Sequence, residues 1–122
     1  MKFGLTEKEL KLIKDVLASN SKVEKALLFG SRAMGTHSYN SDIDILLLGK
    51  ELTLRDESQL MSQMEALNIS YSVDLIREHT VTSEAVKDHV REFGVVIYER
   101  ERAGRGGNVE GGWSDWTGSF QV

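Results

Sequence analysis

The chain has 122 residues, of which 40% are hydrophobic, and a formal net charge of -4 at pH 7. This length suits a single domain with a modest core, and the absence of cysteine excludes disulfides and thiolate metal sites. The acidic balance argues against a long nucleic-acid partner. Since the sequence shows neither an apolar signal segment nor a run long enough to span a bilayer, we expect a cytoplasmic protein with no membrane partner.

Helix and strand signals alternate through the first half of the chain. A capping-box pattern at Thr6 and Glu9, followed by apolar residues at helical spacing, predicts a helix over residues 6–18. An apolar run predicts a buried strand over residues 23–29. We then expect a loop over residues 30–41, with a helical turn at 31–34, and a second strand over 42–48.

The second half continues this alternation. Apolar residues at helical spacing predict helices over residues 53–67 and 82–93, and an apolar-polar alternation predicts a strand over 70–76. Residues 95–98 are typical of a short fourth strand, although the same run is compatible with a longer helix. The order favours the α+β class, with a small mixed sheet and helices packed mainly on one face.

The composition changes after residue 102. Residues 103–122 hold six of the eleven glycines and both tryptophans, without periodicity. We therefore expect one domain over residues 1–102, followed by a disordered Gly-rich tail. Three interpretations of Trp113 and Trp116 remain. They are exposed by chance in a flexible tail, they belong to sequence added to the native protein, or they anchor a partner.

A candidate metal site lies in the second expected strand. Asp42 and Asp44 are two residues apart, so on a strand their carboxylates point to the same face and repel each other unless a cation lies between them. Hard oxygen ligands favour Mg²⁺ or Mn²⁺. If the strand that carries Asp74 is a neighbour, three carboxylates converge, and such a set can hold two divalent ions for displacement at phosphorus.

A candidate phosphate site precedes these carboxylates. Gly30 follows an apolar strand and allows close approach of phosphate oxygens, while Ser31 offers a hydroxyl and an N–H group at the start of a helical turn. The full pattern is Gly-Ser-x3-Gly-x5-Ser-Asp-x-Asp, which ends at Asp44. It places a candidate phosphate-binding turn and a pair of candidate metal-binding carboxylates in one short segment.

The segment GSRAMGTHSYNSDIDILL resembles the signature of the polymerase-β-like nucleotidyltransferases, and most of all the minimal nucleotidyltransferases of bacteria and archaea. The likeness extends over residues 5–99. It implies the polymerase-β-like fold, ATP as nucleotide donor and two Mg²⁺ (or Mn²⁺) ions. It also implies a HEPN-domain partner, commonly a ribonuclease toxin, with the transferase as its antitoxin. Some such antitoxins transfer AMP onto a tyrosine of the toxin.

The resemblance also implies roles for particular residues. Gly30 and Ser31 would bind the triphosphate, Asp42 and Asp44 would ligate both metal ions, and Asp74 would ligate the catalytic ion and help to activate the attacking hydroxyl. The nucleotide site would further include Ser41 and Arg32. For Arg32, contact with phosphate or partner and a solvated loop cation remain equal alternatives, and His89 is expected to be a surface or packing residue.

Two other functions remain open from the sequence. One is a binding module that neutralises a HEPN toxin by complex formation, with an idle or structural site. The other is a transferase that acts on a small molecule or an RNA 3′ end, although such acceptors usually require additional domain surface. The acceptor, the base preference and the oligomeric state are not specified by the sequence.

Overall fold

The computed structural model describes residues 2–38 and 40–100, so the tail expected over residues 103–122 lies outside the described residues, with Trp113 and Trp116. Every expected helix and strand is present, with ends displaced by a few residues. Among the described residues, no helix is long and apolar enough to cross a membrane. The elements are α1 (Glu7–Ala18), β1 (Lys25–Phe29), α2 (Ser31–Met34), β2 (Ile43–Leu48), α3 (Leu54–Glu65), β3 (Val73–Arg77), the 3-10 turn η1 (Glu78–Thr80), α4 (Glu84–Phe93) and β4 (Val95–Glu99).

The four strands form one mixed sheet in the order β3-β2-β1-β4. β1 pairs antiparallel with both β2 and β4, whereas β2 pairs parallel with β3. The parallel pair needs a crossover connection, and α3 provides it. The expected α+β class with a mixed sheet is therefore confirmed, and β4 is a strand rather than a continuation of α4.

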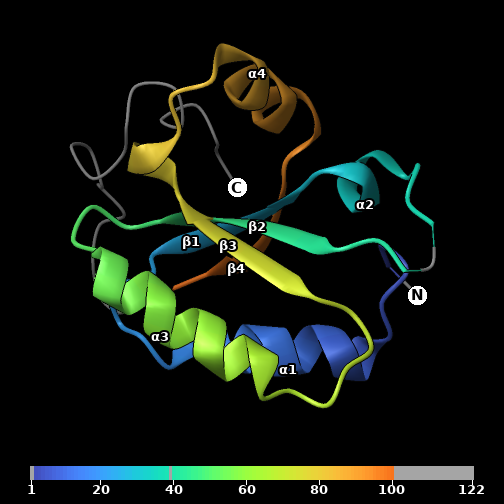
Figure 1. Cartoon of the computed structure of the whole chain (residues 1–122), viewed down its shortest axis with the longest axis horizontal. Coiled ribbons are helices and arrows are strands. Elements are labelled where there is room, and N and C mark those ends of the chain that lie inside the picture. The colour runs from blue at the N-terminus through green and yellow to red at the C-terminus, as the bar shows by residue number, and fades with distance from the viewer. Residues whose placement is uncertain (1, 39, 101–122) are drawn as a thin grey trace.

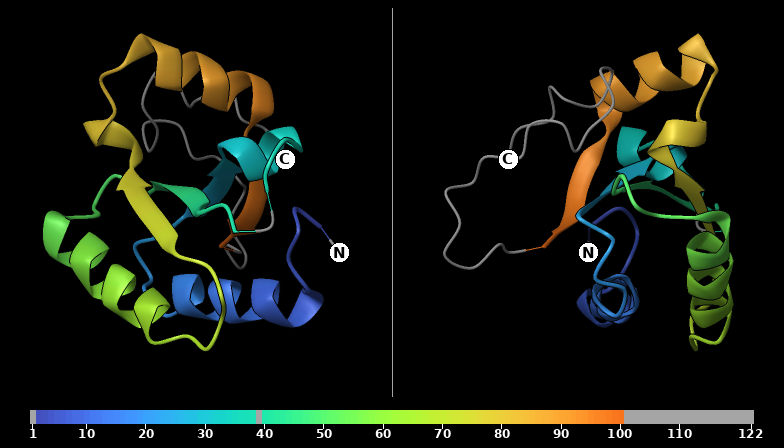
Figure 2. Two further views of the ribbon diagram at one scale, coloured as in Figure 1. Left: turned by 45° about the vertical axis from the view of Figure 1, so that its right-hand side comes forward. Right: turned by 90° about the vertical axis from the view of Figure 1, so that its left-hand side faces the viewer.

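The main core lies between the sheet and the two longest helices. In Figures 1 and 2, α1 and α3 lie together against one face of the sheet. Apolar side chains from α1, such as Ile13 and Leu17, and from α3, such as Leu60, are at most 1% exposed against this face. The alternate positions Ile43 and Ile45 of β2 belong to the same core, because neighbouring residues of a strand point to opposite faces.

The opposite face of the sheet carries a smaller core, which α4 covers (Figure 2). Leu27 of β1 and Leu46 of β2 pack there with Val90 of α4. The helices thus lie mainly on one face, as expected, with α4 as the exception. Asp44 alternates with Ile43 and Ile45, so it points to the α4 face, where the smaller core leaves it half-buried.

A buried carboxylate fixes the start of α3. Asp56 is 7% exposed and accepts hydrogen bonds from the backbone and hydroxyl of Thr53, from the Lys22 ammonium at 3.0 Å and from the Asn20 amide. These donors stabilise the charged form and hold the pKa of Asp56 well below its usual value of 3.8, against the opposing effect of burial. The group therefore joins α3 to the segment that follows α1.

We expect Asp56→Asn to lower the free energy of unfolding at neutral pH by about 2–3 kcal/mol, because the substitution removes a hydrogen-bonded charge. The folded pKa lies below the unfolded one, so the contribution of Asp56 is complete above pH 3.8 and declines as the pH falls below it. Urea unfolding at pH 7 and pH 3 measures both effects. Asp15→Asn, at an exposed position of α1, is the control. The same difference in unfolding free energy between wild type and Asp56→Asn at both pH values would contradict the expected pH dependence.

Candidate active site

Three carboxylates come together on the α4 face of the sheet. In the parallel pairing of β2 with β3, Asp44 lies directly beside Asp74. Asp42 lies two residues before Asp44, just ahead of β2, and is exposed, as is Asp74. The strand of Asp74 therefore neighbours the strand of Asp44, as the three-carboxylate site inferred from the sequence requires.

The electrostatic environment of Asp44 is unfavourable for a lone carboxylate. Its partial burial raises its pKa, and the neighbouring charges of Asp74 and Asp42 raise it further, with only a small opposing effect from His89. Within residues 2–38 and 40–100, no three acidic or histidine side chains form a ready-made metal cage. A set of mutually repelling hard oxygen donors fits a divalent cation, because the cation would relieve the repulsion.

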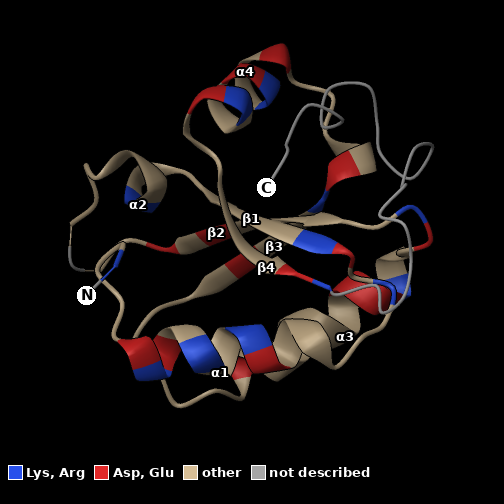
Figure 3. Cartoon of the chain, turned by 180° about the vertical axis from the view of Figure 1, so that it is seen from behind, with Lys and Arg blue, Asp and Glu red and all other residues tan. Residues whose placement is uncertain are grey.

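The turn after β1 brings the backbone against these carboxylates. Gly30 has φ 82° and ψ -161°, a conformation essentially restricted to glycine. A Cβ atom at Gly30 would collide with the carboxylate of Asp44. The turn therefore requires glycine for two independent reasons, and it lies directly beside the carboxylate of Asp44. In Figure 3, the acidic start of β2 lies next to α2.

A histidine of α4 holds the same turn in place. The backbone N–H of Gly30 donates to Nε2 of His89 at 2.7 Å, so Nε2 is the acceptor nitrogen of the ring. The ring packs against Phe29 and Phe93. The expectation of a packing residue is correct, but it missed the hydrogen bond to the turn at Gly30. The available signal was its position on the apolar stripe of α4, with Val86 and Val90.

The two serines of the pattern, Ser31 and Ser41, lie in different environments. Ser31 is half-buried and is the first residue of α2, directly after Gly30. The hydroxyl of Ser41 accepts from the backbone N–H of Ser38 at 3.0 Å, and the Ser41 N–H returns a bond to the Ser38 carbonyl. Ser41 therefore closes the loop immediately before Asp42, and its assignment to the nucleotide stays a prediction.

Arg32 corrects one of the expectations. Its side chain is 1% exposed, so the alternative of a solvated loop cation is wrong. The guanidinium donates to the carbonyls of Ser41, at 2.7 and 3.1 Å, and of Phe3, at 2.7 Å, and lies 4.4 Å from the ring centre of Tyr71. In this arrangement it joins the amino-terminal segment to the loop before Asp42, and its assignment to the nucleotide stays a prediction.

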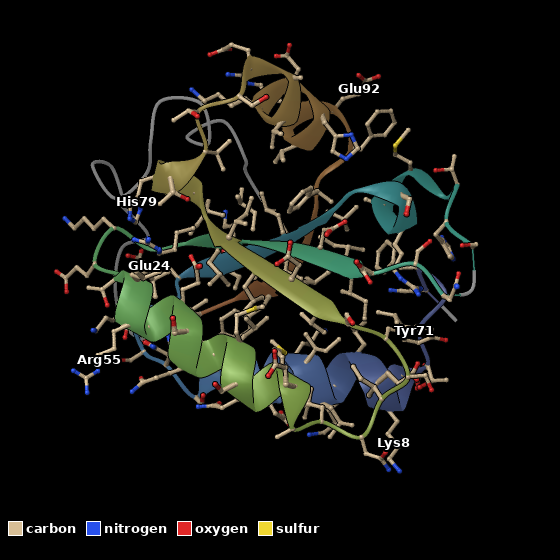
Figure 4. The ribbon with its side chains drawn as sticks, in the orientation of Figure 1. Lys8, Glu24, Arg55, Tyr71, His79 and Glu92 are labelled. Carbon is tan, nitrogen blue, oxygen red and sulfur yellow. The ribbon has the colours of Figure 1, made fainter. Side chains whose placement is uncertain are left out.

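We expect Arg32→Lys to lower the free energy of unfolding by about 2–3 kcal/mol, because a single ammonium cannot replace a planar group that bonds two separate carbonyls. Urea unfolding measures the loss, and hydrogen exchange should show faster opening of residues 36–38. Arg55→Lys, at an exposed position of α3 (Figure 4), is the matched control. Equal stability of the two variants would contradict a structural role for Arg32.

Comparisons with known proteins found a matching family model and several similar proteins. The family model described as polymerase beta, nucleotidyltransferase matches residues 11–103. A protein of Methanocaldococcus jannaschii, provisionally named a protein adenylyltransferase, is 29% identical over 80 residues, which are 62% of this chain and 80% of that protein.

Two similar solved structures are toxin–antitoxin assemblies. One, solved with AMP-PNP, contains a chain with 28% identity and a TM-score of 0.58, and the match covers 80% of this chain and 76% of that one. The other, a variant of the MntA–HpeT pair, has 25% identity and a TM-score of 0.59, with 80% and 75% covered.

Proposed function

This chain belongs to the polymerase beta nucleotidyltransferase family, and on that premise we propose that it transfers AMP from ATP to a tyrosine hydroxyl of a partner toxin of the HEPN type. It thereby acts as the antitoxin of that pair. The observation that carries the proposal is the pairing of Asp44 with Asp74 beside Asp42, next to the turn at Gly30. These groups supply the acidic and the phosphate-binding parts of one reaction site.

The donor would bind on the β1 side of the carboxylates. There Gly30 permits a close approach, and Ser31 follows it with a hydroxyl and a backbone N–H. Asp42 and Asp44 would hold two Mg²⁺ or Mn²⁺ ions, with Asp74 as a further ligand of the ion nearer the acceptor. Such ions supply charge neutralisation of the phosphates and a lower pKa for the acceptor hydroxyl.

The reaction exchanges one bond to the α-phosphorus for another. The tyrosine oxygen forms a bond to the α-phosphorus, and the bond from that phosphorus to the oxygen bridging toward the β-phosphorus breaks, so pyrophosphate leaves on the opposite side. Asp74 is the carboxylate farthest from the phosphate turn, since its strand lies beyond β2. It is therefore the group we assign to receive the hydroxyl proton.

The relatives support this choice of donor and partner. One is named for protein adenylyltransferase activity, and another was solved as a toxin–antitoxin with AMP-PNP, an analogue of ATP. The net charge of -4 also suits a protein acceptor better than a long nucleic acid.

The test is to incubate the protein with a candidate HEPN-type toxin, Mg²⁺ and ATP labelled at the α-phosphate. We expect label on a tyrosine of the partner, found by mass spectrometry, and none when EDTA replaces Mg²⁺. Label from γ-labelled ATP would indicate phosphoryl transfer and overturn the proposal. If the two proteins form a stable complex that neutralises the toxin but no labelled AMP is transferred, the chain is a binding antitoxin. If labelled AMP is found only on small molecules or RNA, the acceptor is one of those instead.

A further inference from the structure

One hydrogen bond joins the glycine turn of the candidate active site to a helix 59 positions further along the chain. The backbone N–H of Gly30, at the end of β1, donates to Nε2 of His89 in α4 at 2.7 Å. In Figure 1, α4 and α2 lie on the side of the sheet away from α1 and α3. In the transfer reaction proposed above, His89 has no role so far.

The ring of His89 is packed so that its acceptor nitrogen stays directed at the turn. Phe29 meets it edge-on, with ring centres 6.2 Å apart, and Phe93 lies 5.3 Å away. The next residue of α4, Val90, is fully buried in the smaller core and holds the helix against the sheet. This packing restricts the side chain before the hydrogen bond forms, so little rotational freedom is lost when it forms.

The turn at Gly30 has no side chain of its own to fix its conformation. Gly30 has φ 82° and ψ -161°, and glycine moves between backbone conformations more freely than other residues. Its carbonyl accepts from the N–H of Met34 in α2, and its N–H donates to His89. The peptide group before Gly30 is therefore oriented by α4, and the one after it by α2.

The orientation of this turn positions the groups that would meet the nucleotide. A Cβ atom at Gly30 would collide with the carboxylate of Asp44, so the backbone lies directly against the proposed metal ligands. Ser31 follows at once, and its hydroxyl and N–H are the donors assigned above to the triphosphate. Since the N–H of Gly30 is already bound to His89, a rotation of the turn would displace the Ser31 donors relative to Asp44.

We propose that His89 is a positioning residue for the nucleotide, which fixes the turn at Gly30 so that the donors of Ser31 face the triphosphate beside Asp44. The inference rests on the proposed function, since it concerns the donor side of the same site. His89 acts through Gly30 and does not itself contact the phosphates. Its loss therefore weakens ATP binding and leaves the chemical step at saturating ATP unchanged.

Three substitutions separate the hydrogen bond of His89 from its packing. His89→Phe keeps a ring between Phe29 and Phe93 but has no acceptor. His89→Gln carries an amide oxygen with about the reach of Nε2, whereas His89→Asn carries it one bond short, near the position of Nδ1. Val86→Ala is the matched control, because it trims α4 in the same smaller core and takes no part in the bond.

The first measurement observes the hydrogen bond itself. The full chain is labelled with ¹⁵N at glycine and histidine, and NMR detects the coupling between the amide nitrogen of Gly30 and Nε2 of His89. We expect this coupling in the wild type both without and with Mg²⁺ and ATP. The N–H of Gly35, which bonds to the Arg32 carbonyl, is the internal reference and should give no such coupling. Loss of the Gly30 coupling when ATP is added would show that phosphate takes this N–H, and would overturn the proposal.

The second measurement is the affinity for ATP with Mg²⁺, by calorimetry and without any partner. We expect His89→Phe and His89→Asn to raise the Kd about three- to tenfold, the effect of one lost hydrogen bond, and His89→Gln to stay within about twofold of the wild type. In the transfer assay, the KM for ATP of His89→Phe should rise while kcat stays within about twofold. Val86→Ala should lower the free energy of unfolding and leave the Kd unchanged.

Unchanged or tighter ATP binding by His89→Phe overturns the proposal. An equal loss of affinity in Val86→Ala also overturns it, because His89 would then act through packing alone. If the affinities follow the expected order but no AMP reaches a candidate HEPN-type toxin, the positioning role stands and the proposed function fails. If transfer is intact while wild type and His89→Phe bind ATP equally, the proposed function stands without this role for His89.

Discussion

Asp44→Asn is expected to reduce AMP transfer about 1,000-fold or more, which corresponds to at least about 4 kcal/mol of lost transition-state stabilisation. Asp44 is the central carboxylate, with Asp74 beside it and Asp42 two residues before it, and asparagine keeps its shape without its charge. The fold should be as stable as that of the wild type or slightly more so, because burial and the two neighbouring charges already disfavour the ionised form and raise its pKa.

The measurement is single-turnover transfer from α-labelled ATP, with thermal unfolding of the same samples. Asp15→Asn, an exposed aspartate of α1 paired with Lys11, is the control and should transfer at the wild-type rate. Transfer by Asp44→Asn within tenfold of the wild type would remove Asp44 from the site and, with it, the proposed arrangement of ligands.

The second large effect is expected at Gly30, and Gly35, which has the same φ, serves as its comparison. Gly30 and Gly35 both have φ 82°, but a Cβ at Gly30 would collide with the carboxylate of Asp44, whereas a Cβ at Gly35 has nothing within 4 Å. Gly35→Ala should therefore cost only the backbone strain of about 1–2 kcal/mol. Gly30→Ala should cost about 3–5 kcal/mol, because strain and steric overlap add, and it should abolish transfer.

Urea unfolding of the two alanine variants gives the stability difference, and the transfer assay at a temperature where both are folded gives the activity difference. Gly30, with ψ -161°, has a more restricted backbone conformation than Gly35, with ψ 9°. The excess loss in Gly30→Ala therefore reports this additional backbone strain together with the contact with Asp44. Similar stability and activity in the two variants would show that the turn does not need this close approach.

Local patterns in the sequence were sufficient for the elements and for part of the site. A capping box predicted the start of α1, apolar residues at helical spacing predicted α1 and α3, and a strand period of two predicted that Asp42 and Asp44 share a face. These features depend on residues a few positions apart, whose geometry follows directly from the helix or strand that contains them. The same reasoning offered Asp74 as a third carboxylate only if its strand were a neighbour, and the resemblance to a known family gave it a role. The pairing of β2 with β3 then brought it to Asp44.

Other features depend on contacts between residues far apart in the chain. The sequence left Arg32 between a phosphate contact and a solvated cation, whereas the fold buries it between carbonyls of Phe3 and Ser41. It also did not show that His89 accepts the Gly30 N–H, 59 positions away.

By itself, then, the sequence determined the class of fold, the carboxylate pair and the glycine turn at Gly30, because short-range periodicity and backbone freedom are encoded locally. Only the tertiary structure decided that Asp74 lies beside Asp44 and that Arg32 is buried. The order of strands in a sheet and the packing of α3 beside β3 arise from long-range pairing, which no local spacing in the chain records.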